Sequence, residues 1–203
     1  MTRTRRPPSG APAEPIRFPV EGLTDGTIRL RLMAEGDVDA VVEACQDAAI
    51  QRWTTVPSPY GSGDARAWLA QASHGIAAGT DLPTLICAAG DQRPLGSVGL
   101  HRIHPELGRA EAGYWVAAPE RGRGLAARGL ALLCAFAFDE LALARVEMAV
   151  EPRNAASRRV AQRAGFTSEG LLRSYMPVGG ARRDMLMYSL LRDDPRLQPV
   201  VAG

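Results

Sequence analysis

The chain has 203 residues, 46% of them hydrophobic and 23% charged, which are the proportions of a soluble globular domain. A chain of this length buries enough surface to fold without disulfides or metals. No apolar run reaches the roughly 18 residues that a membrane-spanning helix needs, and no apolar segment follows the N-terminal arginines as in a secretory signal. The composition therefore excludes a membrane-spanning protein and favours a single soluble domain, expected in the cytoplasm.

The basic residues are all arginines, and the 24 of them nearly balance the 22 acidic residues. Four arginines lie in the first 17 residues, and the rest of the chain is close to neutral. It therefore lacks the basic face expected of a nucleic-acid-binding domain. The cysteines and histidines lack ligand spacing, so we expect reduced thiols and no metal at Cys45, Cys87, Cys134, His74, His101 and His104.

Residues 1–16 are rich in proline and arginine and have no apolar period, which predicts a disordered tail before a single domain at 17–203. Alternating apolar residues predict a strand at 28–32. Asp37 is expected to cap a helix that extends to about residue 49. A loop that contains prolines then leads to a second helix around 65–76.

The second half of the chain continues with strands and two more helices. Strands are predicted at 83–89, 95–103 and 111–117, before a long, nearly all-apolar helix at about 124–140. A strand at 146–150 precedes a short helix that Asn154 caps and Gly165 ends. Strands at about 167–173 and 185–191 flank a Gly179-Gly180 turn. This order of elements predicts a mixed sheet with helices on its faces.

The segment before the long helix has the composition of a phosphate-binding loop: Arg121, Gly122, Arg123, Gly124, Leu125 and Ala126. Its glycines allow tight turns, the first helical turn offers unpaired N–H groups, and arginines add forked hydrogen bonds to phosphate oxygens. A plain solvated turn is the alternative. Gly122, Gly124 and Ala127 also match the dinucleotide fingerprint G-x-G-x-x-A, but the loop does not open a βαβ unit as that fingerprint requires.

Further motifs accompany this loop in a fixed order: Gly113-Tyr114-Trp115 before it, then Asn154-x-x-Ser157 and Gly165-Phe166, and finally Asp184 with Tyr188-Ser189-Leu190-Leu191. With Pro59-Tyr60 near the start and a loop of the form R/Q-x-x-G-x-G/A, the chain resembles the RimJ/RimL-like branch of the GNAT superfamily of N-acetyltransferases. The resemblance covers about residues 24–194.

The resemblance implies a mixed α/β fold. Its central twisted sheet would be largely antiparallel, with about seven strands, about four flanking helices and a splayed V-shaped cleft. It also implies acetyl-CoA as co-substrate, no metal, and direct transfer of the acetyl group to a primary amine. The residues expected to bind acetyl-CoA are Val116, Arg121, Gly122, Arg123, Gly124, Leu125, Ala126, Asn154 and Ser157.

Two proton transfers accompany such a reaction. Glu111 is the candidate base, because strand alternation places it on the same face as Gly113. A charge on a solvated face is the equal alternative for Glu111, and relatives that carry the acid later in this strand have it where Ala117 and Ala118 stand here. Ser157 matches the family serine assigned to the CoA sulfur, with Tyr175 as the reserve proton donor.

The acceptor groove is expected to be lined by Trp53, Tyr60, Trp115 and Tyr175. The acceptor would be a protein N-terminal α-amine or a small-molecule amine, and the motifs do not select between them. No nucleic acid or membrane partner is expected, and a homodimer is left open. The alternative function is a catalytically silent acyl-CoA-binding regulatory module that keeps the loop without a competent base.

Overall fold

The computed structural model describes residues 14–194. Within this range the strands are β1 (Leu23–Thr24), β2 (Ile28–Arg31), β3 (Leu82–Ala88), β4 (Pro94–His104), β5 (Arg109–Val116), β6 (Arg145–Val150), β7 (Thr167–Val178) and β8 (Ala181–Leu191). The α-helices are α1 (Val38–Cys45), α2 (Ala48–Trp53), α3 (Ser62–Ala78), α4 (Leu125–Asp139) and α5 (Ala155–Arg163).

The strands form one sheet in the order β1-β2-β3-β4-β5-β6-β8-β7. Every neighbouring pair is antiparallel except β5 and β6, which are parallel because α4 connects them across one face of the sheet. The predicted mixed, largely antiparallel sheet is confirmed. The strand beyond the predicted seven is β1, which has only two residues.

The first predicted helix is divided into two, which accounts for the additional helix. The Asp47 side chain accepts hydrogen bonds from the N–H groups of Ala49 (3.1 Å) and Ile50 (3.0 Å), so it caps α2 as a new helix. Asp37 stands at the N-cap position of α1, but its side chain makes no capping bond to that helix. Its carboxylate instead binds the Arg31 guanidinium at 2.7 Å, which joins α1 to β2.

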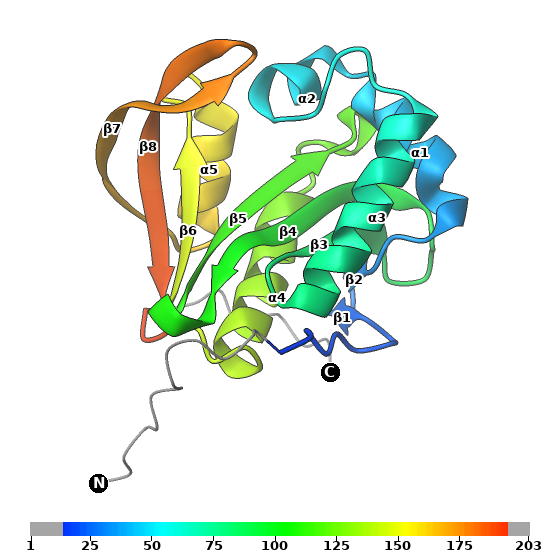
Figure 1. The fold of residues 1–203 in the computed structure, drawn as a ribbon, viewed down its shortest axis with the longest axis horizontal. Helices are drawn as coiled ribbons and strands as arrows, with labels where there is room; N and C mark the ends of the chain where they lie inside the picture. The colour runs from blue at the N-terminus through cyan, green and yellow to red at the C-terminus, as the bar shows by residue number, and fades with distance from the viewer. Residues whose placement is uncertain (1–13, 195–203) are drawn as a thin grey trace, which may run out of the picture.

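The sheet opens between β5 and β6. These strands pair only at their lower ends, through Arg109, Ala110 and Glu111 of β5, whereas β5 stays paired with β4 as far as Val116. In Figure 1 the two strands lie side by side at the bottom and diverge toward the top, where α2 and the β7/β8 hairpin flank the opening. This divergence forms the expected V-shaped cleft.

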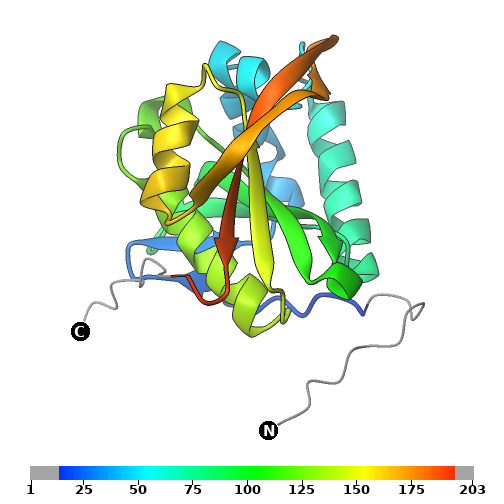
Figure 2. The same cartoon turned by 90° about the vertical axis from the view of Figure 1, so that its left-hand side faces the viewer.

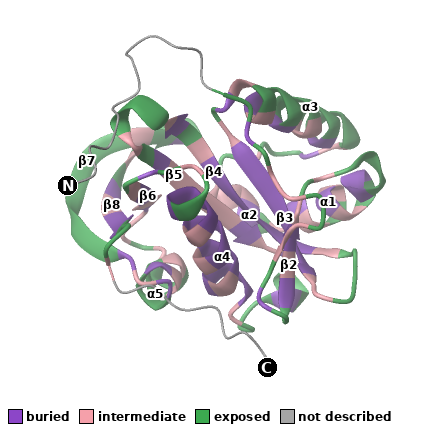
Figure 3. Cartoon of the chain, turned by 90° about the horizontal axis from the view of Figure 1, so that it is seen from below, coloured by how far each residue is buried: buried purple, intermediate pink, exposed green. Residues whose placement is uncertain are grey.

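Helices cover the two faces of the sheet unequally. The long helix α4 packs on one face, with Leu130, Leu133 and Phe138 fully buried (Figure 3). On the other face, α1 and α3 cover the strands near the N-terminus and pack with Trp115 of β5. In Figure 2 the sheet is seen edge-on between the helices of its two faces. The β7/β8 hairpin crosses at the end of the sheet that α1 and α3 leave uncovered.

The ends of the described range differ from the prediction in two details. Ile16, assigned to the tail from the sequence, is buried in the core, and its N–H donates to the Ile76 carbonyl at 2.9 Å. The rest of the predicted tail up to residue 13 lies outside the described residues. In the part of the chain that the structure describes, no helix is long and apolar enough to span a membrane.

Candidate active site

The open arm of β5 presents unpaired backbone to the cleft. The Ala117 N–H donates to the Leu95 carbonyl beside it at 3.0 Å. Because backbone groups along a strand point to alternate sides, those of Val116 and Tyr114 face the gap that β6 leaves. The Val116 carbonyl does point outward, since it accepts a hydrogen bond from the exposed Arg121 side chain at 3.2 Å. An extended ligand with amide groups can pair with this strand edge.

The predicted phosphate-binding loop lies at the top of that edge, where it leads into the N-terminus of α4. Gly122 has φ +80° and Gly124, the N-cap residue of α4, has φ +77°. A Cβ atom at either position would meet no atom within 4 Å, so the backbone there is open to a ligand. The first N–H groups of α4, at Leu125 and Ala126, have no partner within the helix and carry the positive end of its dipole.

Both loop arginines are held by carboxylates. Arg121 forms an ion pair with Asp47, the capping residue of α2, and this contact lowers the pKa of the Asp47 carboxyl. Arg123 pairs instead with Glu120, which also accepts a hydrogen bond from Arg93 at 2.8 Å. Arg93 and Arg123 together lower the pKa of Glu120. The guanidinium of Arg121 therefore faces the cleft, whereas that of Arg123 is turned to a buried carboxylate.

A cavity of about 310 Å³ follows this strand edge and loop. All the residues predicted to bind the cofactor line it, with the exception of Arg123. The structure thus brings together residues that the sequence separates by as many as 41 positions, from the open arm of β5 to the start of α5: Val116, Arg121, Gly122, Gly124, Leu125, Ala126, Asn154 and Ser157.

Two hydroxyl groups meet among the residues that line this cavity. The Tyr114 hydroxyl lies 2.8 Å from the Ser157 hydroxyl, across the gap between β5 and α5. Asn154 caps α5 by accepting a hydrogen bond from the Ser157 N–H at 3.0 Å, which fixes the serine in the first turn. Burial raises the pKa of Tyr114, so its hydroxyl keeps its proton. The sequence identified Tyr114 only as part of a motif and gave it no role.

A second cavity, of about 640 Å³, lies between α2, α3 and the β7/β8 hairpin. It contains carboxylates and an imidazole beside an apolar wall of methionines and tryptophans. The acidic and basic side chains are Asp64, Asp81, His101, Arg102, Glu111 and Glu151, and the apolar wall includes Trp53, Trp68, Met148, Met176 and Met185. The two cavities share Trp53, Thr54, Tyr114, Trp115, Asn154 and Ser157, so they meet beside the pair of hydroxyls.

Three of the four residues predicted to line the acceptor groove line one or both of these cavities. Trp53 and Trp115 line both cavities, and Tyr60 lines the larger one, where burial raises its pKa to about 12. Tyr175 is not a lining residue of either cavity, because β7 contributes Met176 and Val178 instead.

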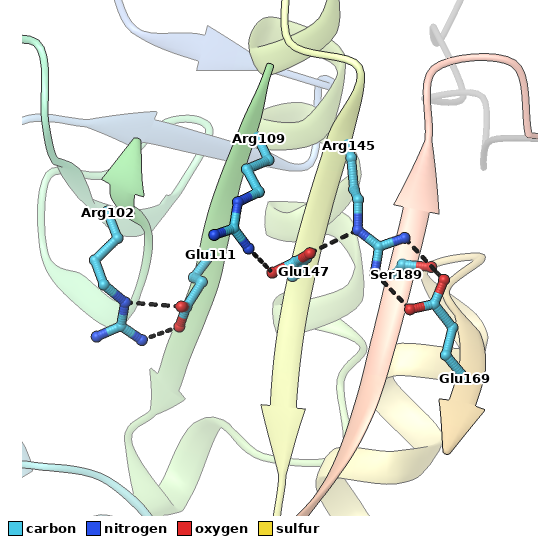
Figure 4. A network of polar contacts seen from close by, with 7 residues as sticks. All are labelled: Arg102, Arg109, Glu111, Arg145, Glu147, Glu169 and Ser189. Carbon is cyan, nitrogen blue, oxygen red and sulfur yellow. Dashed lines mark hydrogen bonds and ion pairs between the residues drawn. The ribbon is translucent and has the colours of Figure 1, made fainter. Parts of the chain in front are cut away.

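Glu111 lines the larger cavity, but an arginine binds both oxygens of its carboxylate. Arg102 donates from Nε to Oε1 at 2.7 Å and from a terminal nitrogen to Oε2. Arg102 lies in a bulge of β4 and has a positive φ of 46°, which turns its side chain toward β5. Figure 4 shows this pair beside a second ion-pair network on β5, β6, β8 and β7, which consists of Arg109, Glu147, Arg145, Glu169 and Ser189.

The described residues contain no group of three or more His, Cys, Asp or Glu side chains placed to hold a metal ion. The three cysteines are buried, and burial raises the pKa of Cys45 to about 12. The polar groups that line the two cavities are hydroxyls, carboxylates, guanidinium groups, amides and an imidazole.

Comparisons with known proteins agree with this geometry. The chain is 38% identical over 98 residues to the uncharacterized N-acetyltransferase p20 of Bacillus licheniformis, which is 48% of this chain and 55% of p20. It spans about half the length of the curated relatives that it matches. RimJ of Mycobacterium smegmatis, solved with a CoA disulfide, superposes with a TM-score of 0.74 at 26% identity over 84% of each chain.

A second solved structure, RimL, an α-N-acetyltransferase of ribosomal protein L7/L12 in complex with coenzyme A, shares the fold with a TM-score of 0.74. It is 23% identical and covers 81% of this chain and 94% of RimL. The model of the acetyltransferase (GNAT) domain matches residues 27–167, which contain the open arm of β5, the glycine loop and α5. This chain belongs to the GNAT acetyltransferase family.

Proposed function

We propose that this protein transfers the acetyl group of acetyl-CoA directly to a primary amine, and that the acceptor is the α-amine of a protein or peptide N-terminus. The observation that carries the proposal is the meeting of two cavities beside Tyr114 and Ser157. One cavity has the features of a CoA site, and the other has room and polar groups for an acceptor.

The smaller cavity suits each part of acetyl-CoA. The helix N-terminus at Leu125 and the Arg121 guanidinium are donors for the pyrophosphate. The outward-facing N–H and C=O groups of Val116 and Tyr114 suit the amides of pantetheine, which would lie along β5 as an added strand. This binding mode places the thioester near the inner end of the cavity, where the two hydroxyls lie.

The reaction then requires no covalent enzyme intermediate. The neutral amine attacks the thioester carbon, a backbone N–H of β5 stabilises the developing oxyanion, and the C–S bond breaks. The departing thiolate receives a proton from the hydroxyl pair of Ser157 and Tyr114. Two groups in the larger cavity are available to accept the proton that the amine loses: Glu111, predicted from the sequence, and His101.

The larger cavity has room for the first residues of a peptide acceptor. Its volume of about 640 Å³ lies near the middle of the range for small-ligand sites, about 300–1,000 Å³, and it opens beside α2 and the β7/β8 hairpin. The apolar wall and the flanking carboxylates suit an N-terminal residue with its positively charged α-amine. The structural neighbour RimL, named as an α-N-acetyltransferase of a ribosomal protein, supports the same class of acceptor.

The test is a thiol-release assay with acetyl-CoA, followed by mass spectrometry of the products from a mixed library of peptides and small amines. We expect peptides acetylated at their α-amine. If only small amines are acetylated, the proposed reaction stands and the acceptor is a small-molecule amine instead of a peptide. Saturable CoA binding without turnover of any amine would instead support the silent binding module.

A further inference from the structure

His101 of β4 is held against Asp81 in the larger cavity. The His101 Nδ1 atom lies 3.3 Å from Asp81 Oδ1, and both side chains line that cavity. A carboxylate can only accept a hydrogen bond, so Nδ1 must carry the proton of this contact. In the neutral imidazole, Nε2 then carries the free lone pair. Asp81 therefore selects the tautomer in which Nε2 can accept a proton.

Two glycines make room for this imidazole on the floor of the cavity. Gly99 of β4 and Gly113 of β5 face each other directly in the sheet. A Cβ atom on Gly99 would lie 3.2 Å from His101 Nε2, and one on Gly113 would lie 3.7 Å from it. The ring therefore lies over the glycine pair, with Nε2 nearer to the Gly99 position than to the Gly113 position. Trp115, two residues further on the same face of β5, lines both cavities.

Glu111 is directly opposite His101 in the sheet, but its carboxylate is bound by Arg102. Both of its oxygens accept hydrogen bonds from Arg102, so protonation of Glu111 would break part of a bidentate ion pair. The contact of His101 with Asp81 uses Nδ1 and leaves Nε2 available to accept a proton.

We infer that His101 is the general base of the acetyl transfer, with Asp81 as its positioning residue and Glu111 as the anchor of Arg102. The inference rests on the proposed function. In this step the amine nitrogen forms its bond to the thioester carbon and loses a proton to Nε2, while the thiolate takes a proton from the hydroxyl pair. The histidine then releases its proton to solvent and the hydroxyl pair takes one up from solvent, so the enzyme returns to its starting state.

The first experiment compares turnover in three single variants at saturating acetyl-CoA and acceptor peptide. His101→Gln should lower kcat by about 10²–10⁴-fold, the range for a positioned base, and leave the affinity for acetyl-CoA unchanged. His104→Gln is the matched control, because His104 lies on the same strand and pairs with Glu106 at 3.1 Å, but outside both cavities. Glu111→Gln should lower kcat by less than about 10-fold.

The pH profile of kcat separates the two candidate bases. The rising limb, which is the increase of kcat with pH as the base loses its proton, should be lost in His101→Gln and retained in Glu111→Gln. The other charged or titratable groups that line the cavity are common to both variants: Cys45 of α1, Asp64 of α3, Asp81, Arg102 of β4, Glu151 after β6, Tyr60 and Tyr114. A His101→Gln variant that keeps its rate within about threefold and retains the limb overturns the inference.

A second measurement needs no turnover. Nitrogen-15 correlation spectra of the imidazoles report the tautomer of each histidine, and the His101→Gln variant identifies the signals of His101. We expect the Nδ1–H tautomer in the wild-type protein and a mixture of tautomers in Asp81→Asn, with kcat reduced and KM unchanged. A wild-type Nε2–H tautomer contradicts the inference. Failure of the proposed function would show differently, as absence of transfer by the wild-type protein itself.

Discussion

The hydroxyl groups of Tyr114 and Ser157 lie 2.8 Å apart and connect β5 to α5 at the point where β5 and β6 have separated. The tyrosine comes from the splayed arm of β5 and the serine from the first turn of α5, whose cap Asn154 fixes its position. The contact therefore sets two proton-bearing groups where the two cavities meet. Neither group alone would be oriented as firmly, because each is the hydrogen-bond partner of the other.

Removal of either hydroxyl should impair protonation of the thiolate. We expect Ser157→Ala and Tyr114→Phe each to lower kcat by about 10²-fold, since a positioned proton donor contributes at least that much. The double variant should lose little more than either single variant, because the two hydroxyls act as one unit. Steady-state kinetics at saturating acetyl-CoA provide the measurement.

The control for this pair is Ser73→Ala, a helix serine on α3 that donates to the Leu69 carbonyl at 3.1 Å, outside both cavities. It should retain the wild-type rate. Strictly additive losses in the double variant would show that Tyr114 and Ser157 act independently and would refute the shared role.

A side chain at Gly124 should obstruct the pyrophosphate. We expect Gly124→Val to weaken acetyl-CoA binding by more than about 10-fold, because the loop backbone must approach the phosphates closely. Gly179→Val is a suitable control. Gly179 also has a positive φ, +57° against +77°, and a Cβ there also meets no atom within 4 Å. Both variants bear a similar left-handed strain of about 1–2 kcal/mol, and calorimetric titration should show normal binding only for Gly179→Val.

The ion pair of Arg121 with Asp47 competes with phosphate for the guanidinium. We expect Asp47→Asn to bind CoA several-fold more tightly, because asparagine retains the cap of α2 but removes the competing charge. Arg121→Ala should bind about 10-fold more weakly, as expected for the loss of a charged hydrogen bond. Arg123→Ala should have a smaller effect, since Arg123 does not line the cavity. Weaker binding by Asp47→Asn would show instead that Asp47 orients Arg121 for the phosphate.

The elements that could be predicted from the sequence are those whose signals are local. The apolar run at 124–140 forms α4. The cap at Asn154 marks the start of α5 and Gly165 follows its end, and the two glycines at 179–180 form the turn of the β7/β8 hairpin. The residues predicted to bind CoA, apart from Arg123, line one cavity, because the loop connects a strand edge to a helix N-terminus.

The remaining features depend on contacts between distant residues. The division of the first helix follows from a cap at Asp47 that also binds Arg121, 74 positions later. The pair of His101 with Asp81 and that of Tyr114 with Ser157 each join separate elements, 20 and 43 positions apart. A single histidine or tyrosine carries no sequence signal for such a partner. For the same reason the engagement of Glu111 by Arg102 could not be foreseen, since it depends on a bulge in β4.

The ion-pair network below the cleft should make stability depend on acid pH. Glu169 accepts hydrogen bonds from Arg145 at 2.8 Å and from the Ser189 hydroxyl at 2.7 Å, and the Arg145 contact is the main reason why the pKa of Glu169 falls to about 2. In the unfolded chain the carboxyl returns to its ordinary value of about 4.5. Because the folded pKa is the lower one, the stabilisation is fully present above about pH 4.5 and is lost as pH falls toward about 2.

Glu169→Gln should therefore be less stable than the wild-type protein near neutral pH, and this difference should shrink steadily as pH falls from about 4.5 to about 2. Urea denaturation at a series of pH values gives the free energy of unfolding for both proteins. Ser189→Ala, which removes one of the hydrogen bonds to the carboxylate, should show a smaller difference with the same pH trend. The glutamate is partly exposed, so the effect should also decrease with added salt. A stability difference that stays constant through this pH range would mean that Glu169 contributes through packing and not through its charge.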